Sequence, residues 1–148
     1  MEAEHVARLR RVIGRLARQL NVTSTGEGLT PSQASVLGLV AVRGPIGLAE
    51  LGELEGLNPS MLSRIVRRLD DDGLIRRLSD PADLRAVRVE ITPAGQLVHD
   101  RLRDLRTKVV SDCLDRLPAA TVDTLSAALA ALEALADELK SAGSTLTT

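Results

Sequence analysis

The sequence contains no Phe, Tyr or Trp and only one cysteine, Cys113. Without aromatic rings no side chain can stack on an unpaired base, which argues against proteins that bind single-stranded DNA or read RNA sequence. One cysteine excludes an internal disulfide framework. The N-terminus lacks the apolar segment of a signal peptide, and no apolar run approaches the roughly 20 residues of a membrane span. We therefore expect a cytoplasmic protein with no membrane partner.

An excess of either charge is also missing, because 19 basic and 20 acidic residues give a formal net charge of −1. Any binding of nucleic acid must then come from a local patch rather than from the charge of the whole chain. The 148 residues, of which 44% are hydrophobic, are enough for one domain with a buried core. We expect a single domain over residues 1–148, with a core of Leu, Val, Ile and Ala.

Motifs of catalytic and metal sites are missing as well. His5 and His99 lie far apart in the sequence, and neither has a Cys or His neighbour at metal-ligand spacing. The sequence has no phosphate-binding loop, no dinucleotide fingerprint and no Gly-x-Ser-x-Gly nucleophile motif. Cys113 falls on an apolar helical stripe, where we expect a buried structural thiol. The sequence predicts no enzyme, no metal and no cofactor.

Apolar residues at helical spacing recur along the chain and predict a mainly helical fold. Thr30-Pro31 and Asn58-Pro59 are typical of helix starts, with an N-cap followed by proline. A short helix with Leu48, Leu51 and Leu54 on one side comes between them. After the second capped helix come a short apolar-rich segment and a strictly alternating one, which together predict a hairpin. The expected helices are 1–21, 31–43, 48–57, 59–72, 93–116 and 119–142, and the expected strands are 74–79 and 87–92.

The helix at 59–72 is the strongest candidate for a functional element. Leu62, Ile65, Val66 and Leu69 form an inner stripe, which leaves a serine- and arginine-rich surface outside. Such a surface alone is more often merely solvated. Here the helix is the second of a helix-turn-helix and precedes a hairpin, so its first half is expected in a DNA major groove.

The charged residues of this helix have different predicted roles. Ser63 and Arg64 are near enough to its start to reach base edges, whereas Arg67 and Arg68 are expected to meet phosphates. Asp70–Asp72 lie about 10 Å further along the helix and need not face DNA. We expect Arg76 and Arg77 to pair with these aspartates and hold the hairpin to the helix.

The loop DPADLRA, residues 80–86, offers a second contact. An arginine at a wing tip suits a narrow minor groove. Arg85 lies two residues from Asp83, whose carboxylate could orient it. A surface loop with an incidental charge pair is an equally good interpretation.

Residues Leu29–Gly95 resemble the winged helix-turn-helix of the MarR (multiple antibiotic resistance regulator) family. The resemblance rests on GLTPSQASVL, on PSMLSRIVRRLDDDGLIRR and on DPADLRAVRVEITPAG, which is similar to the family's wing signature. Leu84 and Ile91 depart from that signature. The implied fold is mainly α with a small β-hairpin wing (α+β). It comprises a DNA-binding lobe at 30–95 and a dimerisation region formed by 1–21 with 96–142.

The resemblance implies a homodimeric transcription regulator, a repressor, that binds a palindromic operator in double-stranded DNA. The DNA-binding residues are then Ser32, Ser60, Met61, Ser63, Arg64, Arg67, Arg68, Asp83 and Arg85. The dimerisation residues are Val6, Leu9, Ile13, Leu125, Leu129, Leu132 and Leu139. A small anionic ligand that releases DNA would meet Arg11 and Arg15. The family's oxidation sensors place a cysteine near the N-terminus, which this chain lacks, so no peroxide sensor is predicted.

Two alternatives stay open. A helical dimer or adaptor could use the winged-helix surface to bind another protein, and its partner interaction would then be insensitive to salt. A ligand sensor could also have lost DNA binding because Asp70–Asp72 repel the phosphates.

Overall fold

The computed structural model describes residues 1–22, 27–79, 82 and 86–145, and these form six helices and one three-stranded antiparallel sheet. The predicted fold class, mainly helical with a small sheet, is confirmed. The chain divides into two compact units, Met1–Lys108 and Val109–Thr148, with the division inside the fifth helix. The elements are α1 Ala3–Val22, α2 Pro31–Arg43, β1 Ile46–Gly47, α3 Leu48–Glu55, α4 Pro59–Asp71, β2 Ile75–Ser79, β3 Val87–Ile91, α5 Pro93–Leu114 and α6 Ala119–Thr145.

Side-chain caps fix the starts of α2 and α4 where the sequence predicts them. The Thr30 hydroxyl accepts a hydrogen bond from the Gln33 backbone N–H at 3.2 Å, and the Gln33 side chain accepts from the Thr30 N–H at 3.0 Å. At α4 the Asn58 side chain accepts from the Met61 N–H at 2.9 Å. Both caps satisfy backbone donors that the first helical turn leaves unpaired.

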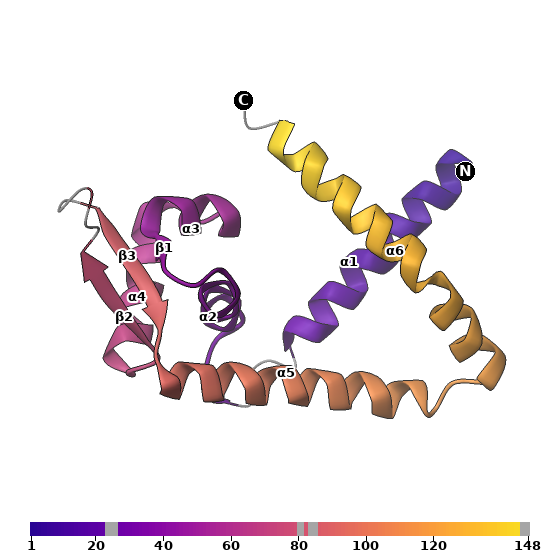
Figure 1. Ribbon diagram of the computed structural model, residues 1–148. Helices are drawn as coiled ribbons and strands as arrows, with labels where there is room; N and C mark the ends of the chain where they lie inside the picture. The colour runs from indigo at the N-terminus through magenta and orange to yellow at the C-terminus, as the bar shows by residue number, and fades with distance from the viewer. Residues whose placement is uncertain (23–26, 80–81, 83–85, 146–148) are drawn as a thin grey trace. The chain divides into compact units, whose positions relative to one another are not determined.

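The sheet has the order β1-β3-β2, in which β2 and β3 form the predicted hairpin (Figure 1). Its register pairs Ile75 with Ile91 and Arg77 with Val89. Strand β1 is an element that the sequence analysis missed, because two residues are too few to show an alternating pattern. It pairs antiparallel with β3 and brings the end of α2 to the hairpin.

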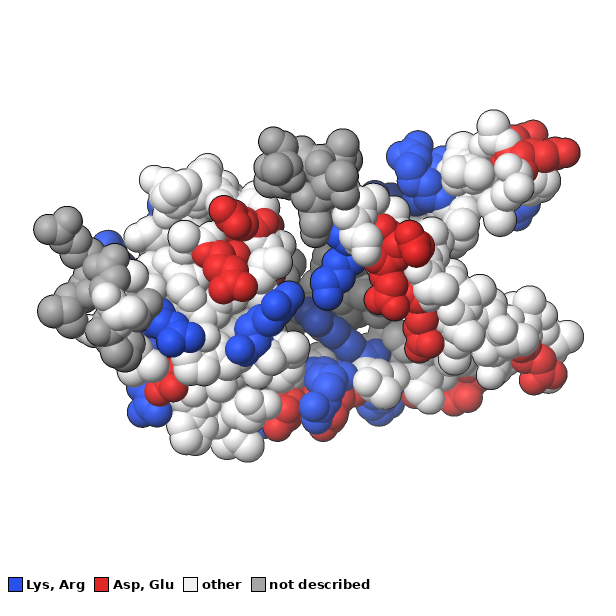
Figure 2. Space-filling view, turned by 45° about the horizontal axis from the view of Figure 1, so that its top comes forward, with Lys and Arg blue, Asp and Glu red and all other residues white. Residues whose placement is uncertain are grey.

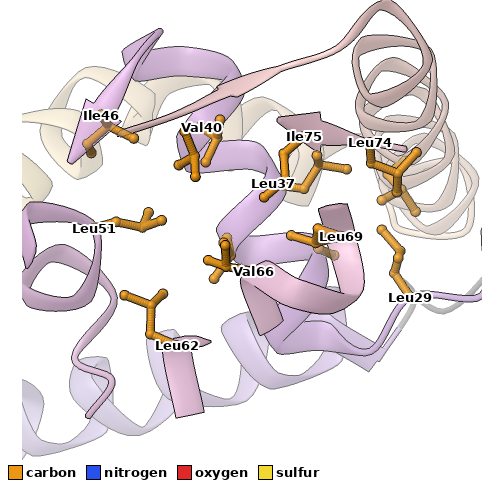
Figure 3. Close-up of a cluster of buried hydrophobic side chains, with 14 residues drawn as sticks. Leu29, Leu37, Val40, Ile46, Leu51, Leu62, Val66, Leu69, Leu74 and Ile75 are labelled. Carbon is orange, nitrogen blue, oxygen red and sulfur yellow. The ribbon is translucent and has the colours of Figure 1, made fainter. Parts of the chain in front are cut away.

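The hydrophobic core lies between α2, α3, α4 and the sheet, and Figure 3 shows its side chains converging from these elements. Leu37, Leu51, Leu69 and Ile75 are fully buried. Leu51 is fully buried whereas Leu54 is 47% exposed, so the predicted leucine side of α3 is not buried as a whole. The reason is helical geometry: steps of three residues drift about 60° per step from the helical repeat. The inner side of α3 is taken by Leu51 and by Gly52, which both lie buried.

A close backbone contact joins the end of α4 to the start of α5. The Thr92 hydroxyl donates to the Gly73 carbonyl at 2.6 Å and accepts from the Gly95 N–H at 3.1 Å. A Cβ on Gly95 would lie 1.9 Å from the Leu74 carbonyl oxygen, so no other residue fits there. Gly73 has φ +72°, the left-handed conformation that glycine commonly adopts just after a helix ends. Several residues of the family signature therefore serve this joint rather than a ligand.

Two helices, each taken by itself, bury almost nothing. No residue of α1 is buried, and neither is any α6 residue up to Gly143. Cys113 in α5 is exposed, which corrects the prediction of a buried thiol. That prediction assumed that the whole apolar stripe of α5 is covered. Among the described apolar side chains of this stripe, Leu102 alone is buried.

Residues Ala119–Gly143 of α6 are long and apolar enough to cross a membrane by length and composition alone, because an 18-residue window within them has a mean hydropathy of 1.4. This stretch is not an uninterrupted apolar run, because Asp123 lies in its second turn and Glu133 near its middle. Asp137 and Glu138 follow one turn after Glu133. Charges at such depths are costly in a bilayer. An apolar helix face awaiting a protein partner passes the same test of length and composition.

Candidate nucleic-acid interface

Helix α4 has a buried side and a polar side. Leu62, Val66 and Leu69 are buried against the core, while Ile65 is half-buried at the margin. The opposite side exposes all six α4 residues predicted to bind DNA: Ser60, Met61, Ser63, Arg64, Arg67 and Arg68. The hydrophobic stripe thus fixes the orientation of the helix, and this orientation directs the serines and arginines to solvent.

The three arginines of α4 differ in their partners. The Arg68 Nε lies 3.0 Å from the Asp72 carboxylate, one turn later on the same helix. Arg64 and Arg67 have no hydrogen bond or ion pair with any residue that the structure describes. Arg64 and Arg67 are therefore available to bind an external anion. Arg68 could bind one only by breaking its pair with Asp72 or by contacting the anion and Asp72 together.

The three aspartates at the end of α4 are largely neutralised. Asp70 pairs with Arg77 of β2 at 3.5 Å, as predicted, and Asp72 pairs with Arg68. Asp71 is exposed and has no such partner among the described residues. Arg76 corrects the prediction, because it pairs with Glu90, its cross-strand neighbour in the hairpin. The net charge near this end of α4 is thus less negative than three consecutive aspartates suggest.

The wing is only partly described. Asp83 and Arg85, the predicted wing contacts, lie outside the described residues. The strands that carry the loop are anchored at a point that sequence reasoning missed. The Arg88 guanidinium donates to the Pro45 carbonyl at 2.8 Å and so ties β3 to the turn after α2. No local sequence pattern connects residues 43 positions apart, so this contact could not be foreseen.

The remaining charges near α2 and α3 are mixed in sign. Ser32 is exposed in the first turn of α2. The Ser35 hydroxyl lies 2.9 Å from one carboxylate oxygen of Glu55 and holds the end of α3 to α2. Glu50 and Glu53 are exposed on α3. On the face shown in Figure 2, acidic and basic side chains are interspersed rather than gathered by sign.

The predicted ligand residues Arg11 and Arg15 are both exposed on α1. Arg15 borders a hollow of about 210 Å³ that is formed by α1 residues alone. A different hollow, of about 310 Å³, lies between α2 and α5. His99, Arg103 and Arg106 line it, and sequence reasoning missed all three as candidate ligand residues. Their spacing along α5 places them on one side of that helix, but only the packing against Gly38 of α2 encloses a hollow.

The predicted dimerisation residues lie on solvent-exposed helix faces within each described unit. On α1, Val6 and Ile13 are exposed and Leu9 is half-buried. On α6, the four leucines expose between 41% and 58% of their surface: Leu125, Leu129, Leu132 and Leu139. Large apolar side chains so exposed, and repeated along one side of a helix, are typical of faces that another surface covers.

Comparison with known proteins gives a consistent result. A sequence model of the MarR family matches residues 29–87. A transcriptional regulator of the HTH type from Mycobacterium bovis is 29% identical over 124 residues, which cover 84% of this chain and 87% of that protein.

Solved structures are similar over nearly their whole lengths. The crystal structure of a probable transcriptional regulator from Pseudomonas aeruginosa is 31% identical, with a TM-score of 0.59, and the match covers 84% of this chain and 98% of that one. A structure of mutant MarR from E. coli complexed with operator DNA is 24% identical, with a TM-score of 0.62, covering 89% of this chain and 99% of that one. The second likeness supports the fold alone.

Proposed function

Because the chain belongs to the MarR family of transcriptional regulators, we propose that it binds a palindromic operator as a homodimer and represses transcription. It is a regulator and not an enzyme, since its relatives are named as transcriptional regulators. The proposal includes action in the cytoplasm, where the DNA lies. The operator-bound MarR structure has the same fold, which supports the use of the same lobe for DNA.

One observation carries the proposal: the exposed side of α4 presents Arg64 and Arg67 without partners in the described structure, beside Ser60 and Ser63. Arginine can bind guanine through two hydrogen bonds in the major groove, and a second arginine can neutralise a phosphate. The N-terminal end of α4 adds a favourable dipole and the backbone N–H of Ser60, whereas the Met61 N–H is taken by the Asn58 cap. We assign base reading to Ser63 and Arg64 and phosphate binding to Arg67, with Arg68 contributing less because of Asp72.

Homodimerisation is supported by the uncovered apolar faces of α1 and α6. A palindrome is read by two copies related by a twofold axis, with recognition helices about one DNA turn apart. A self-complementary surface generates this symmetry. We propose that 1–21 with 96–142 supplies that surface and that the DNA-binding lobe spans 30–95.

Release by a small anionic ligand forms part of the proposal. The hollow between α2 and α5 is lined by His99, by Arg103, which also pairs with Asp100 and Asp104, and by the half-buried Arg106. Two guanidinium groups beside one hollow suit an anion better than the exposed Arg11 and Arg15 of α1. Its volume of about 310 Å³ is at the lower end of the range for small-molecule sites. No aromatic ring can stack on the ligand, because the sequence has none.

The ion pairs at the end of α4 help to decide between DNA binding and the two alternative functions. Loss of DNA binding through repulsion by Asp70–Asp72 is disfavoured, since Arg77 and Arg68 pair with two of the three. An adaptor that binds protein through α4 would bury arginines without partners, which is costly unless acidic groups meet them.

The test compares Arg64→Ala with Arg68→Ala by fluorescence anisotropy on a selected operator duplex. Both variants lose one positive charge from the same helix. Arg64→Ala is expected to weaken binding by about 1–3 kcal/mol and to relax discrimination at one base step. Arg68→Ala should cost less and affect all sequences alike, because Asp72 already offsets that charge. Equal losses would contradict the assigned roles, and unchanged binding by both would overturn the proposal.

A further inference from the structure

An apolar groove runs between α3 and α4, apart from the hollow assigned to an anion. Its volume is about 650 Å³, within the range of small-molecule sites. Most of its lining is hydrocarbon, contributed by Leu48, Ala49, Leu57, Pro59 and Leu62. The groove is therefore large enough for a compact hydrophobic molecule and chemically suited to one.

Glycine keeps the groove open. Gly52 lies at the contact of α3 with α4, where an added Cβ would come within 3.3 Å of the Leu62 side chain. Gly56 also lines the groove and has φ +64°, a backbone conformation that other residues rarely adopt. A bulkier residue at either position would strain the turn or fill the space between the helices.

Glu53 supplies the charge of the groove. Among the lining residues that the structure describes, it is the one with an ionisable side chain. The Glu53 carboxylate forms no hydrogen bond or ion pair with any described residue, whereas the Glu55 carboxylate accepts a hydrogen bond from Ser35. An anionic ligand would be repelled by this carboxylate, and a neutral one would leave it unpaired.

We propose that the groove binds a small hydrophobic cation, a molecule with a compact hydrocarbon body and one protonated amine. The body would contact Leu48, Leu57 and Leu62, and the ammonium would pair with Glu53. Because Ser63 also borders the groove, the bound cation would occupy space beside the base-reading residues of α4. Competition with DNA is a consequence that rests on the proposed function, whereas the binding site itself does not.

The site is tested without DNA, by titrating the full-length protein with three probes that share one hydrocarbon cage. These are 1-aminoadamantane, which is a cation at neutral pH, 1-adamantanol, and 1-adamantanecarboxylate. Amide chemical shifts in nitrogen-15 NMR spectra locate binding and give each dissociation constant. The variants are Glu53→Gln in the groove and Glu50→Gln on the same helix, which removes the same charge outside the groove lining. A third variant, Ala49→Leu, fills the groove.

We expect shifts concentrated in residues 48–63 and an affinity for the cation up to about fivefold above that for the alcohol, the size of an exposed ion pair. The carboxylate should bind most weakly. Glu53→Gln should abolish the preference for the cation, Glu50→Gln should keep it, and Ala49→Leu should weaken all three probes. The proposal is overturned if the three probes bind wild type equally or show no saturable shifts. It is equally overturned if the shifts lie elsewhere, or if Glu50→Gln acts as strongly as Glu53→Gln.

A separate titration of the protein–duplex complex with 1-aminoadamantane tests the consequence for DNA. Displacement that fails in Glu53→Gln but persists in Glu50→Gln would support competition at the groove. If the protein binds the cation but no duplex, the proposed function fails while the site stands. If the protein binds a duplex but not the cation, the proposed site fails while the proposed function stands.

Discussion

The winged-helix lobe and the flanking helices treat the same kind of sequence pattern in opposite ways. In the lobe, apolar residues at helical spacing meet inside one chain, and Leu37, Leu51 and Leu69 are fully buried. In α1 and α6 equally regular spacing leaves its residues uncovered within each described unit. Periodicity therefore predicts where a helix lies and which side is apolar, but it does not predict what covers that side. The lobe is complete by itself, and the flanking helices need another surface.

The largest expected effect tests whether the lobe is complete. Gly95→Ala would place a Cβ against the Leu74 carbonyl oxygen. Because this oxygen is a backbone atom, a change of side-chain rotamer cannot relieve the clash. We expect a loss of about 3 kcal/mol or more in the free energy of unfolding, at the upper end for overpacking. Denaturant unfolding followed by circular dichroism measures it.

Gly38→Ala is the matched control, because its Cβ would meet the His99 ring at an ordinary 3.5 Å in the interior of α2. Alanine also favours a helix over glycine by about 1 kcal/mol. The control should be neutral or stabilising. Equal losses from the two variants would show that the joint between α4 and α5 does not limit the stability of the lobe.

A smaller effect is expected where the flanking helices need a partner. Leu132→Glu would place a charge on the exposed apolar side of α6, whereas Ala134→Glu places the same charge on the opposite side. If a second copy covers that side, Leu132→Glu should weaken dimerisation by at least about 2 kcal/mol, comparable to losing a buried leucine. Sedimentation equilibrium measures the dissociation constant. A monomeric wild type, or equal effects of both variants, would refute a dimer built on this face.

The smallest effect concerns the exposed ion pairs that support α4 within the lobe. Arg77→Ala removes the ion pair with Asp70. The side chains of both residues are more than one-third exposed. Such pairs contribute about 0–1 kcal/mol, so unfolding should change by no more than that. A double-mutant cycle with Asp70→Ala isolates the interaction. A coupling energy above about 1.5 kcal/mol would mean that the hairpin depends on this contact rather than on the shared core.

Features fixed by neighbouring residues are easier to predict from the sequence than contacts between distant segments, and the reason is physical. Caps such as Thr30 and Asn58 act within three residues, so the sequence locates the helix starts that the structure confirms. The inner stripe of α4 likewise orients its arginines. Contacts between distant segments are different. Strand β1 is too short for a pattern, and the bond from Arg88 to Pro45 joins residues that no local rule connects.

Burial was the least predictable property outside the lobe. Cys113 sits on a regular apolar stripe yet is exposed, because the rest of its own unit does not cover that part of α5. In the candidate interface the sequence identified the exposed serines and arginines of α4. It did not predict that Arg68 pairs with Asp72 while Arg64 has no partner among the described residues, since the partner of each arginine depends on side-chain geometry.

Selection of bound duplexes from a random pool by the full-length protein tests the central claim most directly. If two copies present α4 to adjacent major grooves, the enriched sequences should contain an inverted repeat with half-sites about 10 base pairs apart, or a multiple of that spacing. Arg64→Ala should relax the same position in both halves. Recovery of no enriched sequence, or of a motif without twofold symmetry, would contradict a symmetric regulator that reads DNA with α4.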